Sequence, residues 1–336
     1  MKKGFIAAGF TLMFIGIVLL VGALINLGWD ITKLSTVSCK TVIYSPDDSF
    51  KNIEICSGDA DIRIKPSTDG KLSVVCNEQE KIKHTVSVEN GVLKIGFVDD
   101  RAWIDHISLS PEPMLITVFL TQTEYDSLLI EDGSGDIIID TDFIFGSADI
   151  KSDTGDVSCF ATLKGQLNVD TGTGDIVSEN MSAGNISFSV STGKIDLNNA
   201  GCNDTITLST NTGDVKLSNV TCKNLFSRGD TGDIILKEVI ASERFDIERN
   251  TGDVTFEKCD AGAIDIRTSV GDVTGTLRSE KEFSTKTSTG TVRTPGTGSG
   301  GKCTVTTSTG DILIELSPDT ALQKKSFKSA AMICSF

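Results

Sequence analysis

The sequence predicts an all-β protein, a parallel β-solenoid of about ten coils of 19–20 residues each. An irregular β-rich N-terminal cap, preceded by one transmembrane helix, is predicted before the coils. Three observations support this fold class. Ten turn glycines recur at a nearly constant interval, apolar and polar residues alternate on both sides of each glycine, and one long apolar run lies near the N-terminus.

The apolar run covers residues 5–27 and is long enough to cross a bilayer as a helix. It lacks the short apolar region and the small-residue cleavage site of a signal peptide, so we expect an uncleaved anchor. Lys2 and Lys3 precede it, and no matching basic cluster follows. This asymmetry predicts a single-pass protein of the cell membrane, with a cytoplasmic end at 1–4 and, after a linker at 28–49, an extracytoplasmic C-terminal domain.

The predicted extracytoplasmic part is strongly acidic. The whole chain has a net charge of −15, and residues 1–37 hold three lysines and one aspartate, so the remainder carries −17. Nucleic acid is a poor partner for such a domain, because its affinity depends on the neutralisation of phosphates by basic residues. Divalent cations or basic surfaces are better candidates, and a solvated acidic surface without a partner is the simplest interpretation.

The turn glycines define the repeat. Apolar residues lie seven and five positions before most of them and two and four positions after, and the residue two positions after is always Ile or Val. This period of two predicts two short strands and two corners in each coil. The glycines are Gly135, Gly155, Gly174, Gly193, Gly213, Gly232, Gly252, Gly271, Gly290 and Gly310.

The unit length is nearly constant, and each unit places the same residue type at the same position. Both facts favour coils stacked in parallel, with successive antiparallel hairpins as the alternative. The repeats are predicted to span 133–316. Because a stack of repeats needs atypical ends, we expect 50–132 to form the N-terminal cap, with an irregular turn at Gly58 and Asp59, and 317–336 to form the C-terminal cap.

The turn reads Thr-Gly-Asp in most units. Glycine suits a backbone with positive φ, and threonine is a turn former. The aspartate needs a separate explanation, because stacking places these carboxylates in one row and like charges on neighbouring strands repel. Either each carboxylate accepts backbone N–H groups within its own corner, or the row binds cations such as Ca²⁺. The candidate row is Asp136, Asp156, Asp175, Asp214, Asp233, Asp253, Asp272 and Asp311.

Two units have another residue in the aspartate position, Lys194 and Thr291. A lysine within the row would break a series of essential cation ligands. A hydrated corner tolerates it, and the ammonium group can neutralise Asp175 and Asp214 in the adjacent coils. Lys194 therefore favours the structural interpretation of the aspartates.

The chain has nine cysteines, an odd number, without a Cys-x-x-Cys motif or a zinc-ligand spacing. Cys202 and Cys222 each lie nine residues after a turn glycine, so stacking brings them into adjacent coils within reach of a disulfide. Buried cysteines that pack as small apolar residues are the other interpretation. Both interpretations are open at the level of the sequence.

No pattern of catalytic residues is evident. His84 and His106, the only histidines, lie outside the repeats and outside any Ser/His/Asp, zinc or phosphate-loop motif. Some β-helical enzymes act on acidic polysaccharides, but the outward positions four residues before the turn glycines mix acidic, basic and neutral side chains, as a solvated surface does. The sequence thus predicts a non-enzymatic protein without a cofactor.

The apolar anchor, the irregular β-rich start and the repeated "STGD", "NTGD" and "DTGD" turns together resemble the bacterial β-strand-repeat family of putative adhesins, a domain of unknown function common in Gram-positive bacteria. The resemblance covers about residues 50–316. It implies a β-repeat fold and adhesion at the cell surface, and it implies an association with envelope-stress or membrane-regulatory systems. It implies no catalytic or ligand-binding residues.

Two functions follow as hypotheses. In the first, the domain is a surface interaction module that holds a partner protein or a glycan away from the membrane. In the second, it is an accessory or sensory component of a cell-envelope stress system, and a membrane-protein partner carries the signal because only residues 1–4 are cytoplasmic.

Overall fold

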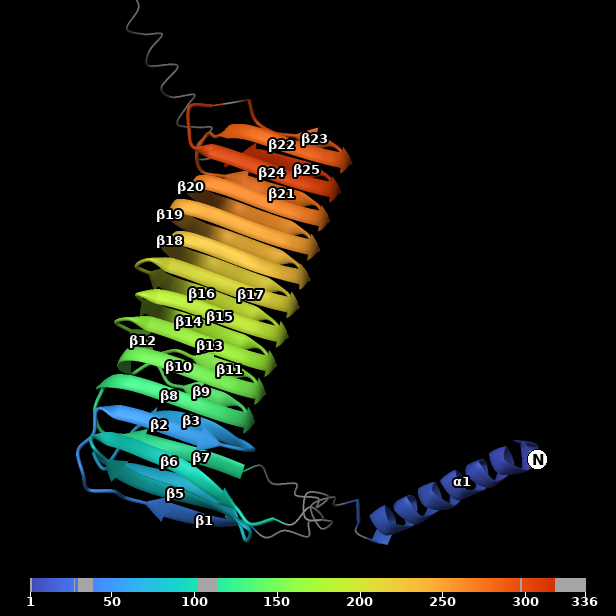
Figure 1. The fold of residues 1–336 in the computed structure, drawn as a ribbon, viewed down its shortest axis with the longest axis vertical. Helices are drawn as coiled ribbons and strands as arrows, with labels where there is room; N and C mark the ends of the chain where they lie inside the picture. The colour runs from blue at the N-terminus through green and yellow to red at the C-terminus, as the bar shows by residue number, and fades with distance from the viewer. Residues whose placement is uncertain (1, 27, 30–38, 102–113, 297, 318–336) are drawn as a thin grey trace, which may run out of the picture.

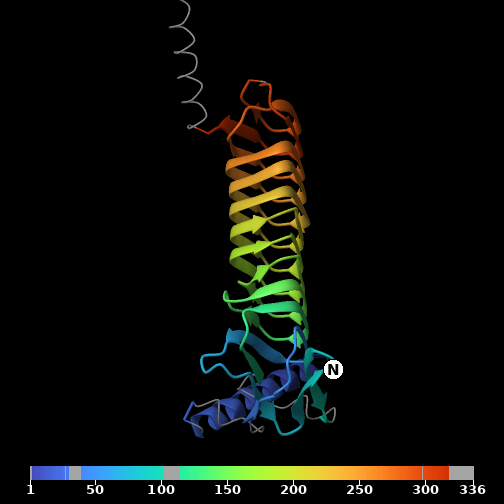
Figure 2. The same ribbon diagram turned by 90° about the vertical axis from the view of Figure 1, so that its left-hand side faces the viewer.

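A computed structural model describes residues 2–26, 28–29, 39–101, 114–296 and 298–317. Figure 1 shows a long stack of strands that run across the axis of a rod, and Figure 2 shows the same rod from its narrow side. The predicted cap at 317–336 lies outside the described residues apart from Ser317. Much of the predicted linker, 30–38, also lies outside them.

Helix α1 (Lys2–Asn26) occupies the predicted apolar segment. In the part of the chain whose side chains are described, no helix has both the length and the apolarity that a membrane crossing needs. The N-terminal strands are β1 (Cys39–Tyr44), β2 (Asn52–Ser57), β3 (Ala60–Pro66), β4 (Ser73–Gln79), β5 (Ile82–Glu89), β6 (Val92–Asp99) and β7 (Met114–Leu120).

The remaining strands build the solenoid, and all of them pair in parallel. They are β8 (Glu124–Ser134), β9 (Ile137–Ile139), β10 (Ile144–Thr154), β11 (Val157–Cys159), β12 (Thr162–Leu163), β13 (Gln166–Thr173), β14 (Ile176–Ala183), β15 (Asn185–Thr192), β16 (Ile195–Cys202), β17 (Thr205–Thr212), β18 (Val215–Thr231), β19 (Ile234–Thr251), β20 (Val254–Val270), β21 (Val273–Leu277), β22 (Glu282–Thr289), β23 (Val292–Arg293), β24 (Lys302–Thr309) and β25 (Ile312–Leu316).

From the Gly135 coil to the Gly271 coil, successive coils stack so that most residues lie above the residue one repeat earlier. Ile186 pairs with Ile206, for example, and Ile195 pairs with Val215. Equivalent apolar side chains therefore lie in columns that form one continuous core. The parallel solenoid is confirmed, and the alternative of antiparallel hairpins is wrong for the repeats.

Most coils have one more buried segment than the two predicted strands. Within β16 the alternation of buried and exposed residues shifts its phase at Asn199, whose φ is 56°. This left-handed residue turns the chain so that a second pair of side chains faces inward. The buried residues of the Gly193 coil are Ile195 and Leu197, then Ala200 and Cys202, then Ile206, Leu208 and Thr210.

The N-terminal cap continues the stack below the first repeat. Strands β2 and β3 pair in parallel with β8 and β9, and β6 and β7 lie beneath them. Below that level the pairing is antiparallel, through β5, β4 and β1. In this cap Ala60 and Asp61, and not Gly58 and Asp59, occupy the turn position, because Asp61 pairs with the Gly135 turn.

The order of the last two coils is reversed relative to the sequence. Strands β24 and β25 stack directly on β20 and β21, and β22 and β23 stack on β24 and β25. The Gly310 coil is therefore inserted between the Gly271 and Gly290 coils. The Gly290 coil, with the half-buried Phe283, is the outermost described rung of the rod.

Candidate functional site

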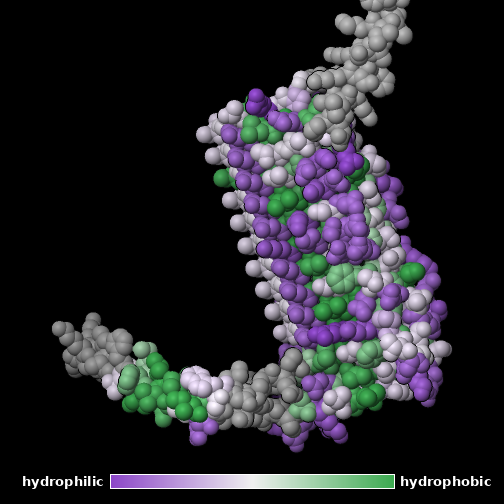
Figure 3. All heavy atoms as spheres, turned by 180° about the vertical axis from the view of Figure 1, so that it is seen from behind, coloured by the Kyte–Doolittle hydropathy of each residue, from purple (hydrophilic) through white to green (hydrophobic). Residues whose placement is uncertain are grey.

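All ten turn glycines lie in one row along an edge of the rod, and their φ angles range from 131° to 158°. A Cβ atom on any one of them would overlap backbone atoms of the coil beneath, usually the carbonyl oxygen of the equivalent glycine. The glycine is thus required by the close approach of consecutive coils. Figure 3 shows this row as a regular column of pale and hydrophilic residues along one edge.

Every aspartate of the candidate row accepts a hydrogen bond from the next coil. Its Oδ1 binds the backbone N–H of the residue that follows the next turn glycine, as in Asp156 with the N–H of Asp175 at 2.7 Å and Asp175 with the N–H of Lys194 at 2.8 Å. The eight donor–acceptor distances lie between 2.6 and 3.0 Å. The expectation that the carboxylate bonds within its own corner is wrong, because the bond joins two coils.

The two exceptions have different places in this chain of bonds. Thr291 belongs to the outermost described rung, where no further described coil offers an N–H group. Lys194 is internal, and it interrupts the chain because it gives Asp214 no carboxylate acceptor from the coil before. At nine of the ten turns, therefore, an aspartate is present where a described coil lies above it and absent where none does. Lys194 is the exception.

The variant Lys194→Asn should be more stable than the wild type by about 1 kcal/mol, since its amide oxygen supplies the missing acceptor for the N–H of Asp214. Lys194→Asp should fold but be slightly less stable than the wild type at low salt. It supplies the same acceptor, yet each of the two neighbouring carboxylates then repels it by roughly 1 kcal/mol. Urea unfolding with and without 1 M NaCl measures both effects, and an Asp variant more stable than the Asn variant would contradict this explanation.

No group of three or more His, Cys, Asp or Glu side chains in the described residues is arranged to hold a metal ion. We propose that the aspartate row is structural, because one oxygen of each carboxylate already bonds the next coil. Thermal melting should therefore give the same midpoint in EDTA and in millimolar Ca²⁺. A rise of several degrees in Ca²⁺ would instead support the cation-binding interpretation.

A second column of mostly polar residues lies inside the same edge, three positions before the turn residue; Val190 and Gly229 are the exceptions. Most of its threonines donate to the carbonyl of the turn glycine in the coil beneath, for example Thr171 to Gly155 at 3.3 Å and Thr307 to Gly271 at 3.1 Å. Thr210 instead donates to the carbonyl of Gly213 in its own turn at 3.4 Å. These bonds satisfy carbonyl groups that the turn would otherwise leave buried and unpaired. The buried polar members are Ser57, Asp132, Ser152, Thr171, Thr210, Arg249, Thr268 and Thr307.

Two members of the inner column are charged residues. Arg249 is 1% exposed and reaches past Gly229 to Thr210, whose Oγ1 accepts from Nη1 at 2.6 Å. Asp132 is 6% exposed, and neither of its oxygens forms a well-directed hydrogen bond with the described residues. Burial raises the pKa of Asp132 from 3.8 to about 6, and the nearby Asp59 contributes to the rise. The nearby Ser57 side chain and Ala60 backbone act to lower the pKa of this carboxyl group, against the larger effect of burial.

The opposite corner carries an asparagine ladder that the sequence analysis did not predict. Asn180, Asn199 and Asn219 lie six residues after their glycines with φ between 53° and 56°, a conformation that asparagine tolerates. Asn199 Nδ2 donates to Asn180 Oδ1 at 2.6 Å, and Asn219 donates to Asn199 in the same way. The signal for this ladder was present as asparagine at a constant offset from the glycine.

Cys202 and Cys222 are free, buried thiols in adjacent coils. Burial raises the pKa of the Cys222 thiol to about 12, and the proximity of Cys202 adds to the rise. A thiol with so high a pKa reacts slowly as a nucleophile. The disulfide between them stays a prediction.

His84 lies on β5 in the N-terminal cap, away from the turn row. Its backbone N–H donates to Oε1 of the buried Glu78, which also accepts from the hydroxyl of Tyr44 at 2.7 Å. Burial lowers the pKa of His84. His106 lies outside the described residues.

The stacked coils and their glycine row define the chain as an all-β repeat protein with a parallel solenoid. Within this class it belongs to the Toastrack DUF4097 family, a domain of unknown function, whose model matches residues 50–204 and 200–330. None of the curated proteins matches the sequence. The resemblance to the β-strand-repeat family that the turns indicated is confirmed.

Several solved structures are similar to the chain. A putative adhesin from Bacteroides fragilis NCTC 9343 shares 14% identity over 84% of this chain and 99% of its own, with a TM-score of 0.41. A putative lipid binding protein from Parabacteroides distasonis ATCC 8503 shares 19% identity over 72% of this chain and 98% of its own, with a TM-score of 0.47. A putative adhesin from the same strain shares 14% identity over 82% of this chain and 98% of its own, with a TM-score of 0.42.

Proposed function

We propose that the chain is a non-enzymatic surface interaction module, anchored to the cell membrane, whose solenoid presents a binding surface away from the bilayer. The observation that carries this proposal is the continuous parallel pairing of strands from β2 to β24. Each coil supports the next through backbone hydrogen bonds, so the stack is a stiff spacer with long lateral faces. Such extended faces are what repeat proteins use for binding.

We propose further that residues 5–27 are the anchor, with 1–4 in the cytoplasm and the domain from 38 onward outside the cell. The large apolar side chains described in α1 support this assignment. Leu12, Met13 and Phe14 are 71%, 57% and 67% exposed, and as consecutive residues they project about 100° apart around the helix. Side chains of this kind are stable in lipid and costly in water.

The proposed division of the chain follows from this anchor. Residues 28–49 are the linker, 50–132 the N-terminal cap, 133–316 the repeats and 317–336 the C-terminal cap. Because residues 38–336 carry a net charge of −17, the proposed partners are a surface protein or a glycan, or a membrane protein beside the anchor, and not a nucleic acid.

Deletion of residues 38–336, with the anchor retained, tests the proposal in the native cells. We expect attachment to surfaces or to neighbouring cells to fall to the level of a strain without the gene. Normal attachment together with an altered output of an envelope-stress reporter would contradict it and support the accessory or sensory role. Asp170→Ala, a change at an exposed position on the solenoid wall, is the control that should leave both readouts unchanged.

A further inference from the structure

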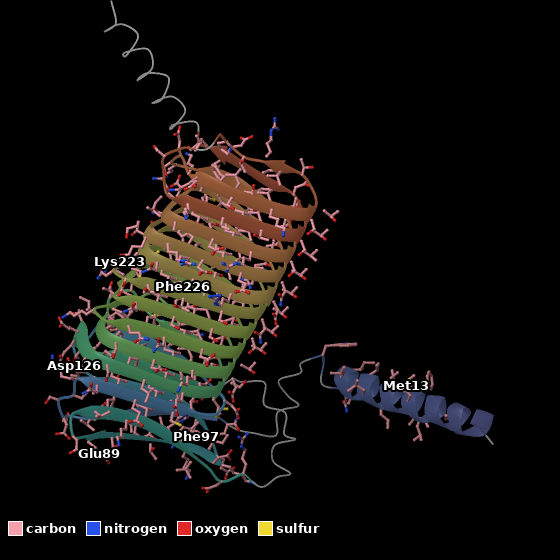
Figure 4. The ribbon with its side chains drawn as sticks, turned by 45° about the horizontal axis from the view of Figure 1, so that its top comes forward. Met13, Glu89, Phe97, Asp126, Lys223 and Phe226 are labelled. Carbon is pink, nitrogen blue, oxygen red and sulfur yellow. The ribbon has the colours of Figure 1, made fainter. Side chains whose placement is uncertain are left out.

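A polar groove lies on the N-terminal cap beside the loop that joins β1 to β2. It consists of two adjoining cavities of about 610 and 320 Å³, which share Ser49, Phe50 and Gln122 in their walls. The larger volume is in the range of small-molecule pockets. In Figure 4, Asp126 and Glu89 project on this side of the rod, and both are close in sequence to groove residues.

The backbone around the groove is held from several elements. The backbone N–H of Lys51 donates to the carbonyl oxygen of Gly91 at 3.1 Å, and the N–H of Asp126 donates to the carbonyl oxygen of Lys51 at 2.7 Å. The N–H of Gln122 donates to the hydroxyl of Tyr125 at 3.1 Å. Beneath the loop, the ring of Phe50 stacks on Tyr125 at 5.7 Å, and Tyr125 stacks on Phe145 at 6.0 Å. The groove is therefore a pre-formed feature on a packed floor, which lowers the entropy cost of binding.

Three polar side chains of the groove are not used by the fold. Asp47, Asp48 and Gln122 are exposed, and their side chains make no hydrogen bond or ion pair with other described residues. Many charged residues on the solenoid wall, by contrast, pair from one coil to the next. Examples are Arg228 with Glu248 at 2.8 Å and Lys216 with Asp196 at 3.5 Å. The groove thus presents unused hydrogen-bonding groups in a concave site.

We propose that this groove binds a neutral oligosaccharide, an inference that rests on the proposed surface-interaction function and names its ligand class. Sugar hydroxyls both donate and accept, and the carboxylates of Asp47 and Asp48, the amide of Gln122 and the ammonium group of Lys71 offer complementary partners. Pro46 and Leu72 supply small apolar surfaces for the C–H faces of the rings.

The charge of the groove selects against other ligands of similar size. Two aspartates oppose one lysine in the larger cavity, and the surrounding domain is acidic, so sialylated, sulfated or phosphorylated ligands are repelled. The apolar lining is too small for a lipid chain. A lysine-rich peptide is compatible with the charge but leaves the amide and hydroxyl groups without matched partners, and it serves as an arm of the test.

The test uses the full chain in detergent on an array of neutral, sialylated and sulfated oligosaccharides, with an oligolysine peptide as a further probe. We expect binding to neutral oligosaccharides alone. The double variant Asp47→Ala/Asp48→Ala and the variant Gln122→Ala should each weaken this binding by tenfold or more. The matched control Asp170→Ala should bind as the wild type does, and thermal melting checks that all variants are folded.

Three results would overturn the inference: no binding of any neutral oligosaccharide at millimolar concentration, equal binding by the groove variants and the control, or tighter binding of oligolysine than of sugar. These failures are distinguishable from failure of the proposed function. If cells that carry the folded groove variants attach normally while the 38–336 deletion abolishes attachment, the interaction function holds and the groove is not its site.

Discussion

Replacing Gly213 with alanine should lower the free energy of unfolding by at least about 3 kcal/mol. The new Cβ would overlap the carbonyl oxygen of Gly193, which is backbone and cannot turn aside, and φ at this position is 145°. Relief of the overlap requires the two coils to separate at the turn. That separation also weakens the backbone hydrogen bond from the N–H of Gly193 to the carbonyl oxygen of Thr212, now 3.0 Å long.

Gly201 in the preceding coil provides the matched control. A Cβ atom added to Gly201 would have Oγ1 of Thr221 as its nearest neighbour, 3.9 Å away, and the φ of Gly201 lies outside the left-handed region. Gly201→Ala should therefore change the stability by less than about 1 kcal/mol. Urea unfolding of the two variants compares them directly. Equal losses of stability in the two variants would show that the close approach of the coils does not require a glycine at the turn.

Asp132→Asn should raise the free energy of unfolding at pH 7.5 by about 2–3 kcal/mol. The folded pKa of about 6 lies above the ordinary value of 3.8, so the folded protein holds this proton more tightly than the unfolded chain does. Stability of the wild type accordingly falls as the pH rises from about 4 to about 6, and this contribution is constant above that range. Asparagine has no proton to lose and avoids the penalty.

The difference in stability between Asp132→Asn and the wild type isolates this group from the other titrating residues. It should be close to zero at pH 4 and reach its full value above pH 6. Denaturant unfolding at pH 4, 5, 6 and 7.5 measures it. A difference that does not change with pH would mean that the Asp132 carboxyl group has the same pKa in the folded and unfolded chain.

The solenoid could be predicted from the sequence because its two strongest constraints are local and repeated. Each coil needs a residue without Cβ at the turn, and it needs a β-branched side chain two residues later to fill the core. Gly193 and Ile195 illustrate both. The turn glycine and the alternation around it are a weak signal in one coil, but they recur ten times at nearly the same spacing. The spacing therefore predicts which residues lie in the buried columns.

The partner of each aspartate could not be predicted in the same way. The sequence places Asp175 next to Gly174, but its hydrogen bond goes to Lys194 in another coil, so the contact depends on the offset between coils at the turn. The groove around Asp47 and Asp48 was also missed. It is formed by three loops of the irregular cap, whose proximity no repeat encodes.

The reversed order of the last coils was missed as well, although the sequence holds two signs of it. Thr285 occupies a position that is apolar in most coils, and Thr291 replaces the aspartate. Both are suited to a rung with one side open, where the inward face is partly hydrated and no next coil needs an acceptor. Their meaning emerges only once the Gly290 coil is known to be outermost.

Thr291 also bears on how long the rod can become. Along the row every coil that has an aspartate offers a carboxylate to the backbone N–H of the coil above, so most units of the stack carry an attachment point for the next. The outermost described unit has Thr291 in place of the carboxylate, and Lys286 places a charge on its strand β22. A second molecule that stacked on this rung would meet a hydroxyl in place of a carboxylate, and a charged strand. Both features oppose the end-to-end assembly of rods into fibres at the outermost described coil.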